Sequence, residues 1–401
     1  MDKFGNHIKN ILHGFFLAIG TTIAEPSTIL PLIVNYFGGS SMLVGFFAAL
    51  LRGGAIVVQL FAAFHAQTYE LMLPHLRRIF FIRFFSWFFI GIAILLFGDD
   101  YPNLTLASIG FGLFFFSFSA GFAAIYFREI MAKIFSHKFR GKTMAYRQFF
   151  SAVGGLLSGV LAGYILHAYE APFSYALLFI ISAFIMGFGY LSFSLVDEPK
   201  KEVVSKKESS FKKFLHNAFA LLGTDRVFAN QVKTFLLAYG YLIALPFIIL
   251  DAQERIHLDG VAIGSLITTQ MIGAMLSNFL WGKLSGAGKN KTVAQLAITM
   301  QIVAVVMATF SSSLYEYMAV FFLVGASIDG NRIASSNLVL KLAPEDKRPI
   351  YIALQMNIVS SGMFFSIAGG LILHYLSYNF LYGSAVVTLM AALYFSRRLQ
   401  E

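Results

Sequence analysis

The sequence lacks cysteine altogether and has few charged residues, which make up 12% of its 401 positions. The absence of cysteine excludes disulfides, thiolate metal sites and cysteine nucleophiles. Soluble domains carry about 25% charged residues, so this composition cannot supply a surface that faces water. Because 58% of the residues are hydrophobic and the mean hydropathy is +0.72, lipid must be the solvent for most of the chain.

Twelve apolar segments are long enough to cross a bilayer, which takes about 20 residues. They cover approximately residues 11–35, 42–64, 79–98, 104–127, 146–168, 172–195, 230–250, 261–282, 293–312, 315–340, 351–373 and 379–396. The first segment has no small-residue cleavage site before or after it, so we expect a spanning helix and not a signal peptide. The pattern predicts an all-α membrane protein with both termini on one side.

Lysine and arginine lie almost entirely on one side of these segments. With a cytoplasmic N-terminus, the inner segments hold nearly all of them, including six lysines within 200–213, and the outer segments hold only Arg255. The outer segments carry acids instead, namely Asp99, Asp100, Glu170, Asp251, Glu254, Asp259 and Glu316. This asymmetry predicts a multi-pass protein of the cell membrane, the bacterial inner membrane in particular, with both termini cytoplasmic. It also explains the net charge of +10 without a nucleic-acid partner.

A polar segment over residues 197–213 divides the chain into two similar halves. After it, residues 211–222 place Phe and Leu on one face, which predicts a helix lying on the inner membrane surface. We therefore expect a six-helix bundle over 1–196, a cytoplasmic linker over 197–226 and a second six-helix bundle over 227–401. An offset of 208 residues aligns Lys133 with Lys341, Arg140 with Arg348, Gly154 with Gly362 and Ser158 with Ser366. Spans two and eight also match, with Gly45 against Gly264 and Gly54 against Gly273.

With this 6+6 repeat, the basic central loop and the Arg140-Gly141 and Arg348-Pro349 loops, the chain resembles the major facilitator superfamily over essentially its whole length. The resemblance implies two bundles that rock around a small-molecule site near the membrane midplane. It also implies that spans one, four, seven and ten line that site. Two family patterns are missing: the Gly-x-x-x-Asp-Arg loop after span two, and the Gly-Pro pair that drug/proton antiporters carry in span five.

Glu25 and Arg52 stand inside otherwise apolar spans, where a charge costs roughly 3 kcal/mol or more at the helix centre. Each lies ten residues from the outer end of its span, about 15 Å deep, so consecutive antiparallel helices can bring them into contact. One interpretation is a proton-coupling carboxylate, Glu25, whose partner is Arg52 or an anionic substrate. The alternative is a permanent structural ion pair.

Asp329 and Arg332 share one face of span ten because they are three residues apart. The resemblance places Asp329, Asn331 or Arg332 at the central site, with Asp329 as a second proton-coupling candidate. The alternative is that the two charges neutralise each other and hold the helix in place. Gly330 here, and Pro26 in span one, weaken helix hydrogen bonding, so we expect both regions to be able to bend.

Other polar residues are weaker candidates. Tyr239, Tyr241 and Gln270 are possible substrate-lining residues on spans seven and eight, with packing as the alternative. At the inner ends of spans four and five, Arg128, Glu129 and Arg147 are expected to form a cytoplasmic gate or to contact lipid headgroups. The sequence has no metal-ligand cluster, no phosphate loop and no nucleophile–base arrangement, so we expect no cofactor and no enzymatic activity.

Together these features predict a monomeric secondary transporter whose partners are a small-molecule substrate, protons and the lipid bilayer. Arg52 and Arg332 are expected to orient an anionic group of the substrate. Proton-coupled export of an amphipathic compound is favoured, because an acid followed by Pro-x-x-x-x-Pro in span one resembles proton-coupled exporters. The alternative is uptake or facilitated diffusion of an organic anion bound by Arg52 and Arg332.

Overall fold

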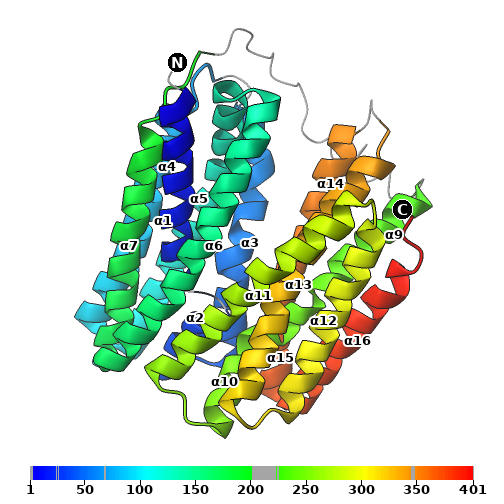
Figure 1. The fold of residues 1–401 in the computed structure, drawn as a ribbon. Coiled ribbons are helices and arrows are strands. Elements are labelled where there is room, and N and C mark those ends of the chain that lie inside the picture. The colour runs from blue at the N-terminus through cyan, green and yellow to red at the C-terminus, as the bar shows by residue number, and fades with distance from the viewer. Residues whose placement is uncertain are drawn as a thin grey trace. The chain divides into compact units, whose positions relative to one another are not determined.

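A computed structural model describes residues 3–23, 25, 27–66, 69–200, 223, 225–344 and 348–400. In these residues every regular element is a helix (Figure 1). The helices of the first half are α1 (Lys3–Ile23), α2 (Ile29–Tyr36), α3 (Ser41–Ala66), α4 (Leu73–Phe97), α5 (Pro102–Ile134), α6 (His137–Ala168) and α7 (Phe173–Ser194). Those of the second half are α9 (Arg226–Ala238), η1 (Tyr239–Ile243), α10 (Leu245–Arg255), α11 (Gly260–Gly286), α12 (Asn290–Phe310), α13 (Leu314–Leu342), α14 (Arg348–Ser360), η2 (Ser361–Phe364), α15 (Phe365–Tyr375) and α16 (Tyr378–Ser396). The predicted surface helix over 211–222, most of the linker and Pro26 lie outside the described residues.

All twelve predicted spans are present as helices. Within the described residues, nine helical segments are long and apolar enough to cross a membrane. The three spans that are not among those nine are α1–α2, α3 and α13, which hold the charged residues that the sequence singled out.

Three spans are interrupted. Span one ends as α1 at Ile23 and resumes as α2 at Ile29. Span seven passes through the 3-10 segment η1 before α10. The first turn of α10 contains a proline, which costs no hydrogen bond there because N–H groups in the first turn have no partner within the helix. Span eleven passes through η2. By contrast, α13 runs unbroken through Gly330, whose missing Cβ leaves room for the indole of Trp281. The bend expected at Gly330 is therefore not present in this structure.

The chain forms two compact units. Unit 1 comprises residues 1–39, 50–208 and 258–268, and unit 2 comprises residues 40–49, 209–257 and 269–401. In unit 1, α1 packs against α6 and α7, and α4 packs against α5 and α7. In unit 2, α12 packs against α13 and α16, and α16 also packs against α9 (Figure 1). Each unit has one tryptophan that is fully buried, Trp87 in unit 1 and Trp281 in unit 2.

Matched glycines make matched helix contacts in the two units. A Cβ on Gly154 of α6 would lie 2.7 Å from a backbone oxygen of α1, and a Cβ on Gly362 would lie 2.5 Å from the side chain of Tyr239, in the span that corresponds to α1. Likewise Gly54 of α3 meets α5, and Gly273 of α11 meets α13. These close backbone approaches explain why the repeat preserves small residues at those positions.

Candidate functional site

Glu25 lies in the break between α1 and α2, and its carboxylate is the centre of a small polar cluster in unit 1. Oε1 of Glu25 forms an ion pair with Nη2 of Arg52, from α3, and accepts a hydrogen bond of 3.1 Å from Oγ of Ser27. The side chains of Arg52 and Glu25 are 22% and 15% exposed. The structure thus brings together the two residues whose equal depth predicted contact, at a point where the helix is interrupted.

Asp329 is the centre of a second cluster, in unit 2. Its Oδ1 accepts a 2.8 Å bond from Nη2 of Arg332, and its Oδ2 accepts a 2.9 Å bond from the amide of Asn278 on α11. The Asp329 side chain is 13% exposed, whereas that of Arg332 is 64% exposed. The carboxylate is therefore held by the protein on both oxygens, while most of the Arg332 side chain is exposed.

The other polar residues expected in unit 2 lie in different environments. Both amide atoms of Asn331 are buried without a hydrogen-bond partner among the described residues, and so are those of Gln301 on α12, which was not among the sequence-predicted candidates. Tyr241 and Gln270 are buried, and Tyr239 is half-buried with its ring centroid 6.3 Å from that of Tyr241. All three residues interact with another residue, and their role in lining a site stays a prediction.

The three expected gate residues lie on α5 and α6, and their role in a gate stays a prediction. Arg128 is exposed on α5, and Glu129 beside it is half-buried. Arg147 reaches from α6 to α1, where its Nη1 donates to the carbonyl and side-chain oxygens of Asn10, at 2.9 and 3.2 Å, and to Nδ1 of His13 at 2.8 Å. Its guanidinium carbon also lies 4.8 Å from the ring centre of Phe127. In the described part of the chain, no carboxylate forms an ion pair with Arg147.

Sequence reasoning missed Arg83, a buried arginine in the middle of α4. Its Nε donates to the hydroxyl of Tyr190 at 3.0 Å, and its Nη1 donates to the carbonyl of Phe116 at 2.7 Å. The guanidinium carbon also lies 3.9 Å from the Phe116 ring centre. The signal was an arginine inside the apolar segment 79–98, although only four residues from its predicted start. No ion pair between described residues includes Arg83.

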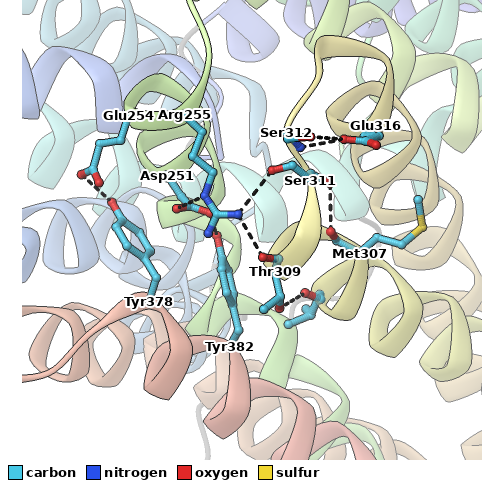
Figure 2. Close-up of polar contacts among 11 residues, drawn as sticks. Asp251, Glu254, Arg255, Met307, Thr309, Ser311, Ser312, Glu316, Tyr378 and Tyr382 are labelled. Carbon is cyan, nitrogen blue, oxygen red and sulfur yellow. Dashed lines mark hydrogen bonds and ion pairs between the residues drawn. The ribbon is translucent and has the colours of Figure 1, made fainter.

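A further polar cluster lies in unit 2 where α10 and α12 end (Figure 2). Asp251, in the last turn of α10, accepts bonds from Nε of Arg255 at 2.9 Å and from the hydroxyl of Tyr382 at 2.7 Å. Arg255 also donates to the carbonyls of Thr309 and Ser311, at the end of α12. The Asp251 side chain is only 3% exposed, whereas Glu254 and Arg255 at the end of the same helix are exposed.

Glu198, just after α7, connects α7 to the start of α4 and the end of α5 in unit 1. Its carboxylate accepts the backbone N–H groups of Met72 and Leu73, at the start of α4, and forms a 2.6 Å ion pair with Lys133 in the last turn of α5. An acid at a helix N-terminus satisfies N–H groups that have no partner within the helix. Within the described residues, no group of three His, Asp or Glu side chains could hold a metal ion.

Comparisons with known proteins agree with these features. The family model described as Major Facilitator Superfamily matches residues 11–250 and 232–400. A comparison with curated proteins returns no match. Among solved structures, the nucleoside transporter NupG is 11% identical with a TM-score of 0.78, covering 98% of this chain and 100% of its own. A D-xylose–proton symporter is 14% identical with a TM-score of 0.71, covering 100% of this chain and 97% of its own.

A bacterial homologue of the iron transporter ferroportin, in its inward-facing state, is 12% identical with a TM-score of 0.69, and the match covers 98% of both chains. Identities this low show a shared fold, and the family model adds evidence from the sequence itself over nearly the full length. The two lines agree with the twelve helices and the repeated glycine contacts described above. The chain therefore belongs to the major facilitator superfamily, whose members carry small solutes across membranes.

Proposed function

We propose that the protein is a secondary transporter that couples movement of a small solute to movement of protons by alternating access, with Glu25 as the coupling carboxylate. The observation that carries this proposal is the Glu25–Arg52 ion pair at the interruption of span one. An ion pair in this position can be exchanged for another, because the backbone on either side of Glu25 is not fixed by one continuous helix.

The coupling works through competition for Arg52. When an anionic group of the solute binds Arg52, Glu25 loses the cation that favours its charged form and takes up a proton. When the solute leaves, Arg52 forms the ion pair with Glu25 again, and Glu25 releases its proton. Because the solute and the proton each change the other's affinity by the same factor, movement of one drives movement of the other.

Arg332 is the proposed solute-binding residue of unit 2. Its side chain is 64% exposed although it stands inside a spanning helix, and its partner Asp329 is also held by Asn278. An exposed arginine at membrane depth faces an aqueous path or the protein interior, since lipid would not solvate it. An anionic group on the solute would satisfy it. The acid and following prolines of the first span indicated export of an amphipathic solute, but a site that takes up the solute and the proton together moves both in the same direction, so this scheme describes proton–solute cotransport.

A second candidate function is uptake or facilitated diffusion of an organic anion without proton movement. The exposure of Arg332 favours it, because an arginine that binds an anion directly needs no titrating partner. The two candidates differ in what Glu25 does. In the second, Glu25 only holds Arg52 in place, so a variant with a neutral residue there would still exchange the anion.

The test uses proteoliposomes with a trapped pH dye, screened with organic acids, organic cations, amino acids, sugars and amphipathic drugs added on either side. Proton coupling predicts solute-dependent pH changes that disappear in a folded Glu25→Gln variant and persist in Glu170→Gln, a control that removes an exposed acid outside the spans. The Glu25→Gln/Arg52→Gln double variant, which leaves no unpaired charge, checks that lost coupling is not lost folding. Solute exchange that continues in Glu25→Gln with no proton movement in any variant would instead establish the anion facilitator.

A further inference from the structure

Arg147 is a cation in unit 1 that the described residues do not neutralise. All its hydrogen bonds are made by Nη1, to Asn10 and His13, and these acceptors are neutral. Its Nε and Nη2 have no partner in the described part of the chain, and neither is among the fully buried atoms that lack one. The edge formed by Nε and Nη2 is one of the two edges of a guanidinium that bind an oxyanion with two parallel hydrogen bonds.

The surroundings of Arg147 hold its position before any ligand arrives. The amide of Asn10 donates to Oγ1 of Thr143 at 3.1 Å, which leaves its side-chain oxygen directed at the guanidinium. Gly14 of α1 provides the space for the arginine side chain: a Cβ there would lie 2.5 Å from Cγ and 3.2 Å from Cζ of Arg147. The guanidinium is therefore fixed in orientation, which reduces the entropy lost when it binds a partner.

His13 adds no charge beside Arg147, because its ring is neutral. Arginine only donates hydrogen bonds, so Nδ1 of His13 must accept from Arg147, and the ring is neutral with its proton on Nε2. That Nε2 is buried and has no partner among the described residues. The ring is 3% exposed and also lies within electrostatic reach of Arg83. Two arginines thus flank a neutral histidine, and neither has a carboxylate partner in the described residues.

We propose that Arg147, supported by Asn10, His13 and the nearby positive charge of Arg83, forms an oxyanion-binding subsite at the inner side of unit 1, for a carboxylate or phosphate group. Arg147 lies five residues inside the span Lys142–Ala168, or about 7.5 Å along the helix. At this depth the oxyanion can come from a solute or from the headgroup of an anionic lipid. Only the first source rests on the proposed transport function, as an inner station for the same anionic solute.

The test measures binding directly, so that it does not depend on transport or on Glu25. Protein in nanodiscs of phosphatidylcholine alone is titrated with benzoate, succinate or inorganic phosphate, and binding is followed by calorimetry. A parallel set of nanodiscs contains phosphatidylglycerol and no solute, and the shift in melting temperature is measured. Arg147→Gln should weaken the affinity for the solute by at least about tenfold, as expected for lost charge-assisted bonds. In the lipid arm, it should reduce the shift in melting temperature that phosphatidylglycerol causes.

Two further variants separate the site from general charge and from folding. Gly14→Ala keeps the arginine but occupies the space beneath it, so it should weaken binding nearly as much as Arg147→Gln. Arg398→Gln removes a positive charge from the exposed C-terminal end of the chain and should leave binding unchanged. If only the lipid arm responds to Arg147→Gln and Gly14→Ala, the subsite stands with a lipid headgroup as its ligand. If neither arm changes in either variant, the proposal is refuted, and Gly14→Ala decides alone where Arg147→Gln fails to fold.

Discussion

Removing Arg52 should destabilise the protein far more than removing both members of its ion pair. In Arg52→Gln, Glu25 would keep only the hydroxyl of Ser27 as a described hydrogen-bond donor to its carboxylate. Breaking a fully buried pair costs about 3–5 kcal/mol, because the remaining charge is left without compensation. The two side chains are 22% and 15% exposed, so water recovers part of that loss, and we expect about 2–3 kcal/mol by the same reasoning. With both charges removed, as in Glu25→Gln/Arg52→Gln, the loss should fall below about 1 kcal/mol.

The assay is thermal unfolding in detergent, followed by the fluorescence of the buried tryptophans. A Trp281→Phe background leaves Trp87 as the only tryptophan, so the signal reports on unit 1, which contains the pair. Two to three kcal/mol corresponds to a fall of roughly 5–10 °C in melting temperature for a unit of this size. If the double variant melts as low as Arg52→Gln, the two charges are not coupled and the reasoning about the pair is wrong.

Three other changes test the packing and the topology. Gly325→Ala should destabilise the folded protein by about 1–3 kcal/mol or more, because its Cβ would lie 1.9 Å from a carbonyl oxygen of α11. Gly282→Ala is the control: its Cβ would have nothing within 4 Å, so it should be neutral or slightly stabilising in the same melting assay. Tyr382→Phe should cost about 1–2 kcal/mol, because Asp251, 3% exposed, loses one of its two donors; an unchanged melting temperature would show that water replaces the hydroxyl. Because the native chain has no thiol, a single cysteine placed in 197–213 should react with impermeant maleimide only in inside-out vesicles, and labelling from outside would overturn the topology.

The twelve spans could be predicted because lipid imposes a simple rule: every backbone group in the hydrocarbon must be satisfied within a helix. A long apolar run therefore has essentially one solution. Interruptions within a span are harder to predict, because they depend on which neighbouring helix hydrogen-bonds to the backbone groups that the interruption leaves without a partner. Pro26 made a bend in span one foreseeable, but the 3-10 segment η2 in span eleven has no comparable signal, and Gly330 lies in a helix that stays intact because Trp281 packs against it.

The charged pairs could be predicted as contacts, because depth and helix spacing are properties of the sequence. The sequence could not predict which other residues hydrogen-bond to each pair or how exposed each charge is. In the sequence, Glu25–Arg52 and Asp329–Arg332 are both pairs of an acid and an arginine. In the structure, however, Asn278 of another helix hydrogen-bonds to Asp329, and Arg332 is exposed. The contacts of Arg147 with α1 were equally out of reach, since Asn10 and His13 lie more than 130 residues away in sequence.

The difference between the two pairs bears on which acid carries the proton. Asp329 is held at both oxygens on a helix that is continuous on either side, so its contacts change only if α11 or the Arg332 side chain moves. The bonds to Glu25 come from Arg52 on α3 and from Ser27 within the interruption, so a change of angle between α1 and α2 is enough to separate it from Arg52. A proton carrier must exchange its partner in every cycle, and a fixed carboxylate does so less readily. Under the proposed coupling, this geometry favours Glu25 as the proton carrier and assigns Asp329 the role of orienting Arg332 toward an anionic solute.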